Sequence, residues 1–303
     1  MTSSLVSSLS SHQEPLYREK KLDFYFKNLI PDYHCENMQE LHTTPAKDSA
    51  CGIPVAHISL LQAGNMQKSN RAVRNNFFLR QGIEPNLVLS AVQIHSKKIL
   101  FFDDEKTFPA ETEADGIITC NPNLLPAVLV ADCMPIFLFD TKSRAFGVLH
   151  SGWRGTGIAL EALKLLKQKF NTSAADVFFI LGPHIRNCCY TVDAERARFF
   201  RRLAKSSVNL SVQKLLCLSR WRYRLSLANA NRSLLETAAV PPENILDTEL
   251  CTNCNTIAQL CSRGFLPETY AGNTDFSFGS NRRENPHGQT SFTRMIAYIQ
   301  SGA

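Results

Sequence analysis

VLVADCMPIFLFDTKSRAFGVLHSGWRGTG, residues 128–157, is the stretch around which the rest of the chain is organised. It contains three short apolar runs, at 128–130, 135–139 and 145–149, separated by polar residues. Such runs, bounded by Asp, Ser and Gly, predict buried strands joined by tight connections. Cys133 and His150 are therefore expected at strand ends, where a rigid scaffold commonly holds functional side chains on loops.

A second histidine lies upstream in a similar setting. His95 follows the strand-like run 87–92, and we expect 99–102 to be the hairpin partner of that run. Two histidines and one cysteine at strand ends could form a zinc site with three protein ligands and one open position, which is the catalytic pattern. Because the three residues are far apart in sequence, their spacing alone leaves this site a hypothesis.

A series of short motifs resembles, in order, those of the laccase-domain or YfiH-type family. They are QIHS (93–96), ADGI (114–117), ADCMP (131–135), HSGWRG (150–155), GPHI (182–185), CCY (188–190), CT (251–252) and FSF (276–278). The similarity runs from about residue 53 to the C-terminus. The resemblance implies zinc-dependent purine nucleoside phosphorylase activity with accompanying adenosine deaminase activity. It also maps the family's metal ligands onto His95, Cys133 and His150.

The fold that we expect is α+β, with mixed β-sheets packed together and helices outside; the resemblance relates it to cytotoxic-necrotizing-factor-like toxin deamidases. An amphipathic helix is predicted over 155–170, because apolar residues recur at helical spacing. Its N-terminus should point at the site and favour an anion there. Arg154 is a candidate catalytic residue that would hold phosphate, with a salt bridge pinning the turn as the alternative.

Two carboxylates and several basic residues are further candidates. Asp132 or Asp115 would be the acid–base or orienting carboxylate, and Asp115 would otherwise be a plain turn residue. Candidate substrate-binding residues outside the central stretch are His184, Arg71, Arg74 and Arg283. Two departures from the family pattern, Asn76 in place of Arg and Ser226 in place of Asp, leave a non-enzymatic binding protein as an alternative.

Composition bounds the class of protein. The 303 residues carry a formal net charge of +6, which suits anionic small substrates but falls short of a nucleic-acid footprint. No run is long and apolar enough to cross a membrane, and no signal peptide is recognisable. The ten cysteines are then expected to be reduced, in a cytoplasmic protein. We predict a disordered tail over 1–20 and a single catalytic domain over 21–303.

Three enzyme functions remain open. The first is the zinc enzyme acting on purine nucleosides (adenosine, inosine, methylthioadenosine) and phosphate. The second is a metal-free Cys–His hydrolase or amidase, for example in peptidoglycan editing, with Cys133 as nucleophile and His150 as base. The third is a copper-dependent polyphenol oxidase; the chain has eight histidines and no His-x-His pair, which argues against a multicopper centre, although copper could occupy the single site in vitro.

The remaining cysteines suggest no second metal site. Cys251 and Cys254 form a CxxC pair, but no second CxxC and no histidine at finger spacing follow. Cys188 and Cys189 are interpreted as a vicinal structural pair. The oligomeric state is not predicted.

Overall fold

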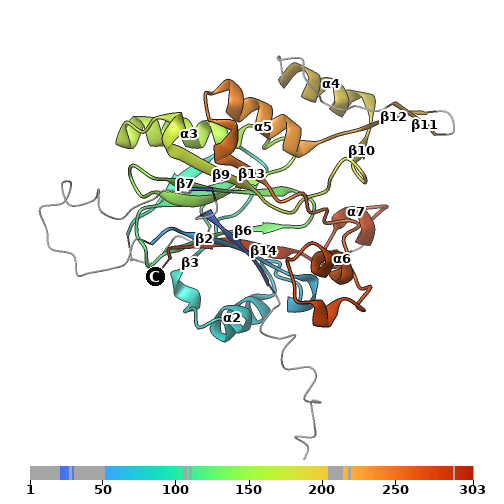
Figure 1. The fold of residues 1–303 in the computed structure, drawn as a ribbon, viewed down its shortest axis with the longest axis horizontal. Helices are drawn as coiled ribbons and strands as arrows, with labels where there is room; N and C mark the ends of the chain where they lie inside the picture. The colour runs from blue at the N-terminus through green and yellow to red at the C-terminus, as the bar shows by residue number, and fades with distance from the viewer. Residues whose placement is uncertain are drawn as a thin grey trace, which may run out of the picture.

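The computed structural model describes residues 21–26, 29–30, 52–104, 108, 111–203, 214–217, 220–288 and 291–302. The tail expected over 1–20 lies outside these residues. The architecture is built from two large sheets that face each other, with helices on their outer faces (Figure 1). This confirms the expected α+β class. No helix within the described part of the chain is long and apolar enough to span a bilayer.

The six-stranded sheet contains the central stretch. Its strands, in spatial order, are β13 (Ile245–Asp247), β9 (Val177–Leu181), β7 (Met134–Asp140), β8 (Phe146–Ser151), β5 (Gly116–Thr119) and β4 (Ile99–Phe101). Every residue of β7 and β8 is buried, as expected for apolar runs covered on both faces. The central position of these strands explains why their sequences lack a polar face.

The five-stranded sheet draws on distant parts of the chain. Its order is β1 (Lys21–Tyr25), β2 (Val55–Ser59), β14 (Met295–Gln300), β6 (Leu125–Val130) and β3 (Val88–Leu89). β6 lies in this sheet while β7 lies in the other, so the chain crosses between sheets at residues 131–133. β3 and β4 are likewise in different sheets, and each pairs in parallel with another strand, so the expected hairpin between them is wrong.

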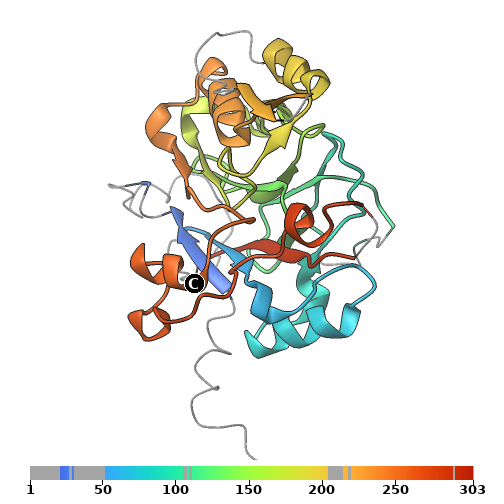
Figure 2. The ribbon, with the colours of Figure 1, turned by 90° about the vertical axis from the view of Figure 1, so that its right-hand side faces the viewer.

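A small third sheet and six α-helices complete the described fold. The sheet has the order β10 (Thr191–Val192), β12 (Arg220–Arg224) and β11 (Lys214–Cys217). The helices are α2 (Arg71–Arg80), α3 (Ile158–Phe170), α4 (Ala194–Leu203), α5 (Leu227–Thr237), α6 (Ile257–Ser262) and α7 (Asn281–Glu284). In the view of Figure 2, α7 and the C-terminal segments, in red, lie between the half that carries α3 to α5 and the half that carries α2.

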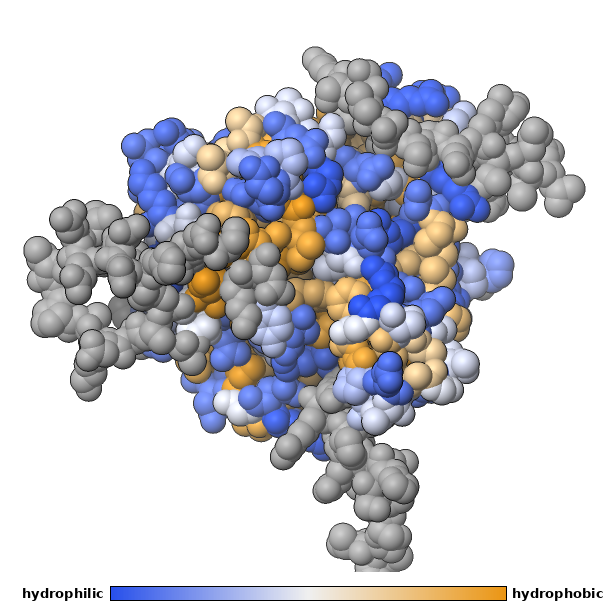
Figure 3. All heavy atoms as spheres, viewed as in Figure 1, coloured by the Kyte–Doolittle hydropathy of each residue, from blue (hydrophilic) through white to orange (hydrophobic). Residues whose placement is uncertain are grey.

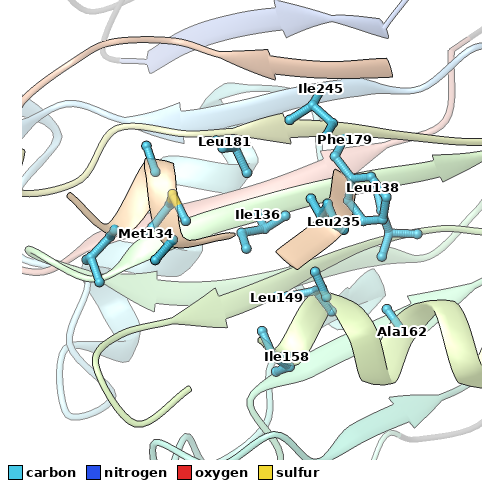
Figure 4. Packing of buried hydrophobic residues seen from close by; sticks show 14 of the residues in the cluster. Met134, Ile136, Leu138, Leu149, Ile158, Ala162, Phe179, Leu181, Leu235 and Ile245 are labelled. Atoms are coloured by element: carbon cyan, nitrogen blue, oxygen red, sulfur yellow. The ribbon is translucent and has the colours of Figure 1, made fainter. Parts of the chain in front are cut away.

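Apolar packing holds the layers together. Ile58, Val128 and Ala297 of one sheet meet Phe137 and Val148 of the other in a core between the two sheets. A second core lies between the six-stranded sheet and the helices α3 and α5, where Ile136, Leu149, Ile158, Ala162 and Leu235 pack together (Figure 4). The predicted amphipathic helix is confirmed, because α3 buries Ile158, Ala159, Ala162 and Leu166. In the region of α3, Figure 3 shows hydrophilic residues together with some apolar ones at the surface.

Candidate active site and metal centre

The three predicted ligands come from chain crossovers and a strand end. His95 lies between β3 and β4, and Cys133 lies between β6 and β7, so both are on connections that pass from one sheet to the other. His150 is the penultimate residue of β8 and pairs with Pro135 of β7. Strand pairing therefore places His150 beside the start of β7, which Cys133 directly precedes.

The structure brings these side chains together. The ligand atoms of His95, Cys133 and His150 all lie within 4.8 Å of one another. The two imidazole centroids are 4.9 Å apart, with the rings edge to face. Gly152 borders the group, and a Cβ built there would lie 2.7 Å from Cys133 Sγ, so the close approach of the chain requires a glycine.

Asp115 holds both histidines in place. Its side chain is fully buried, and His150 Nδ1 donates to its Oδ1 at 2.9 Å. The same carboxylate accepts from the backbone N–H of His95 at 3.0 Å and from the N–H and hydroxyl of Ser96 at 2.6 and 2.8 Å. Those bonds hold His95 at φ 58°, which is uncommon for a residue other than glycine. Asp115 thus orients the ligand set.

The charges of this group are strongly coupled. Burial works against ionisation of Cys133, but His150 and His95 outweigh it and lower the pKa of the thiol to about 6. Burial likewise opposes a charge on His150, yet Cys133 and Asp115 raise its pKa to about 9. The pKa of Asp115 is lowered to about 2, because hydrogen bonds from His150 and Ser96 overcome the effect of burial. In the metal-free protein the favoured arrangement is therefore a Cys133 thiolate beside a protonated His150.

These donors suit a metal ion, and zinc in particular. Two imidazole nitrogens and one thiolate are the ligands that zinc accepts, with a fourth position left for a reactant. Because the Asp115 carboxylate accepts from Nδ1 of His150, Nε2 is the nitrogen that would bind a metal ion once it loses its proton, which is the way a carboxylate commonly orients a histidine ligand. The residues present fit the group that the sequence suggested.

A cleft of about 420 Å³ opens over this centre. That volume lies in the range of small-molecule sites. Its lining combines the metal-ligand candidates His95 and Cys133 with basic, aromatic, polar and apolar residues: Ile94, Asp132, Gly152, Trp153, Arg154, Ile185, Tyr190, Arg196, Leu227, Asn281 and Arg282. The cleft thus offers three guanidinium groups and two aromatic rings next to the candidate metal site.

The aromatic part of the wall is braced by stacking. Arg196 of α4 lies over the ring of Trp153, with its guanidinium carbon 4.2 Å from the centroid. Phe199 of the same helix stacks on Trp153 at 6.1 Å. Trp153, Tyr190 and Arg196 were not among the candidate site residues predicted from the sequence. The apolar face of α4 was a signal for its packing, but nothing local indicated what it packs against.

Asp132 is a structural anchor on the cleft wall. Its Oδ1 accepts from the hydroxyls of Thr252 and Ser280 at 2.9 and 2.8 Å, and its Oδ2 accepts from the backbone N–H of Arg282 at 2.7 Å. Burial raises the pKa of this carboxyl despite these bonds. Both oxygens are engaged, so the residue fixes Arg282 at the cleft.

Several candidate residues lie away from the cleft lining. Arg74 of α2 donates to the backbone carbonyls of Met66 and Gln67, and Arg71 is exposed on the same helix. His184 is buried and its Nδ1 bonds the Gly182 carbonyl at 2.8 Å, so it caps the turn. Arg283 donates to the carbonyls of Thr252 and Asn253 at 3.1 and 2.8 Å, and its neighbour Arg282 lines the cleft in its place.

The N-terminus of α3 is also placed differently from the expectation. The N–H of its cap, Gly157, faces the side chain of Asn231 at 3.3 Å, and the N–H of Ile158 bonds the Gly155 carbonyl. The cleft is lined by Gly152, Trp153 and Arg154, one turn earlier in the chain. Arg154 therefore reaches the cleft while the helix end does not.

Known proteins are similar to this chain in sequence and in architecture. The family model described as multi-copper polyphenol oxidoreductase laccase matches residues 57–258. A human protein named purine nucleoside phosphorylase LACC1 is 34% identical over 147 residues, which are 46% of this chain and 33% of that protein. Purine nucleoside phosphorylase YlmD of Bacillus subtilis is 34% identical over 140 residues, 46% of this chain and 49% of the relative.

Solved structures extend the likeness over more of the chain. The crystal structure of YlmD from Geobacillus stearothermophilus is 25% identical, with a TM-score of 0.67 over 82% of this chain and 92% of that one. The YfiH structure from Bacillus licheniformis is 26% identical, with a TM-score of 0.65 over the same shares. By contrast, the chain spans only a third to a half of the length of the two curated relatives above.

Proposed function

The chain belongs to the multi-copper polyphenol oxidoreductase laccase family, and from this premise we propose that it is a zinc-dependent purine nucleoside phosphorylase. Its substrates would be purine nucleosides (adenosine, inosine and methylthioadenosine) together with phosphate, and adenosine deamination would be a side activity. The names of the relatives support the phosphorylase. The observation that carries the proposal is the convergence of His95, Cys133 and His150 beneath a cleft edged by arginines.

The metal-ligand candidates and Asp115 would have distinct roles in this reaction. His95, Cys133 and His150 would hold the metal, and Asp115 would fix the imidazole of His150 and the backbone of His95. Zinc held there would supply a Lewis acid that polarises an oxygen of a bound reactant. Phosphorolysis otherwise depends on positioning, because the attacking anion must be held close to the ribose carbon that loses the base.

Arginines are suited to that positioning. Arg154, Arg196 and Arg282 border the cleft, and a guanidinium binds phosphate through two parallel hydrogen bonds. Arg282 is held by Asp132 through its backbone, and Arg196 is held against Trp153, so both are fixed before a ligand arrives. Arg154 is exposed, and its guanidinium carbon lies 5.4 Å from the centroid of the Trp153 ring, at the cleft where an anion would bind. The indole of Trp153 and the ring of Tyr190 offer stacking surface for a purine.

The test is release of hypoxanthine from inosine by zinc-loaded protein, which we expect only when phosphate is present. Arg154→Ala should raise KM for phosphate about 10- to 100-fold, since a charge-assisted hydrogen bond contributes about 1.5–3 kcal/mol. Arg71→Ala makes the same change of charge on α2 and should leave KM unaltered. Release of base without phosphate, or equal effects of the two variants, would contradict the proposal.

A metal-free Cys–His hydrolase is the second candidate, because Cys133, His150 and Asp115 also form a nucleophile, base and orienting carboxylate in series. The rate of alkylation of Cys133 distinguishes the zinc enzyme from the metal-free hydrolase. If zinc holds the thiolate, iodoacetamide should modify Cys133 slowly in freshly purified protein and at least tenfold faster after a chelator is added. Cys120 serves as the internal reference, because burial raises its pKa to about 12 and a chelator should not change its rate. Rapid modification of Cys133 before chelation would favour the hydrolase.

A further inference from the structure

Four cysteines meet at a second place in the described part of the chain. Cys188 and Cys189 lie in the loop after β9, and Cys251 and Cys254 lie in the loop after β13. Their sulfur atoms all lie within 4.8 Å of one another. No partner for the CxxC pair was recognisable in the sequence, and the structure places the vicinal pair Cys188 and Cys189 beside it.

We propose that these four thiols form a structural zinc site, separate from the catalytic centre. Cys188 Sγ and Cys254 Sγ are 3.7 Å apart. A tetrahedral site with Zn–S bonds of ~2.3 Å has sulfur–sulfur edges of about 3.8 Å, whereas a disulfide needs ~2.05 Å. All four cysteines are free. Four thiolates are also the donor set of closed structural zinc sites, which leave no position for a reactant.

The backbone prepares this place for a metal ligand. Backbone N–H groups of Arg186, Asn253 and Cys254 donate hydrogen bonds to the sulfur of Cys251. Such donors stabilise a thiolate, which is the form of cysteine that binds a metal ion.

Strand pairing brings the two loops together without help from the metal. β9 and β13 are parallel neighbours, so their following loops leave the sheet at the same edge. The loops then bond to each other: the N–H of His184 reaches the Leu250 carbonyl, and the N–H of Thr252 reaches the His184 carbonyl. Arg186 and Asp247 form an ion pair at 2.7 Å between them. These contacts between the two loops therefore bring the four thiols together.

The position of the site gives it a role. One loop carries Ile185 and Tyr190 to the cleft, and the other carries Thr252, whose hydroxyl bonds Asp132. Asn253 contacts Ser280 and accepts from Arg283 through its carbonyl. Zinc among the cysteines would hold both loops, and through them the cleft wall, in one arrangement.

Metal counting tests the proposal independently of activity. Wild-type protein purified under reducing conditions should contain two zinc ions per chain, and Cys254→Ser and Cys133→Ala should each contain one. In the Cys133→Ala background, cobalt substitution should give the intense thiolate-to-cobalt absorption of a tetrahedral site with several sulfur ligands. Cys120→Ser is the matched control and should keep both ions.

Thermal unfolding gives a second readout. Cys254→Ser should lower Tm by about 5 °C or more, because zinc that binds only the folded chain stabilises it.

One zinc in the wild type and none in Cys133→Ala would overturn the second site. A Cys188–Cys254 disulfide in protein kept under reducing conditions would also overturn it. If Cys254→Ser does not fold, the cobalt spectrum of Cys133→Ala decides alone. Failure of the nucleoside assay with two zinc ions bound would sink the proposed function and leave this site standing.

Discussion

Replacing Cys133 with alanine is expected to abolish metal binding at the catalytic centre and to lower phosphorolysis by about 10³-fold or more. The thiolate is the one anionic ligand candidate among His95, Cys133 and His150, and both histidines stabilise its negative charge. A bound metal ion contributes several kcal/mol to a transition state, and each ~1.4 kcal/mol is a factor of ten in rate. The loss of this ligand should therefore appear in kcat rather than in KM for phosphate.

The measurement pairs zinc content with hypoxanthine release from inosine. Cys120→Ala is the control, because Cys120 lies after β5 and its thiol faces the Ser143 carbonyl at 3.7 Å, outside both cysteine-containing groups. The control should keep its metal and its rate. Cys133→Ala protein that keeps full activity would exclude a catalytic role for this centre, whatever its metal content.

Local sequence was sufficient to predict the parts of the fold that depend on neighbouring residues. The runs around Val128, Phe137 and Val148 are buried strands, and the stripe on α3 packs on the sheet. The sequence also placed the candidate ligands Cys133 and His150 at strand ends, and the structure brings them together with His95, while metal binding by these residues stays a prediction.

Pairings between distant segments were beyond that reasoning. Residues 87–92 and 99–102 are close in sequence, which favoured a hairpin, but the bonds of Asp115 to the backbone of 95 and 96 turn the chain toward the other sheet. Arg282 was passed over for Arg283, because the choice depends on Asp132 accepting from the Arg282 N–H some 150 residues away. The proximity of the two cysteine pairs was not predicted for the same reason: β9 and β13, which precede them, are neighbours only in space.

Asp115→Asn is expected to weaken zinc binding at the catalytic centre by about 10- to 100-fold, which is the usual cost of losing the carboxylate behind a histidine ligand. The asparagine has nearly the same shape, but its NH₂ group cannot accept the hydrogen bonds that His95, Ser96 and His150 donate. At least one buried donor is left without a partner, and His150 loses the group that fixes Nε2 toward the metal. Zinc affinity measured by competition with a chromophoric chelator should show the drop.

Stability should fall together with affinity. Breaking a fully buried charged pair costs on the order of 3 kcal/mol, so metal-free Asp115→Asn should unfold at a lower denaturant concentration than metal-free wild type at pH 7. The folded pKa of about 2 is below the ordinary 3.8, so the contribution of the carboxylate is present above 3.8 and is lost as the pH falls toward 2. The gap between variant and wild type should therefore narrow in that window. Asp103→Asn is the control, because this exposed carboxylate accepts from Thr119 and Cys120 at the other end of β5. If both variants lose stability equally while zinc affinity stays unchanged, Asp115 is a turn residue and does not position the ligands.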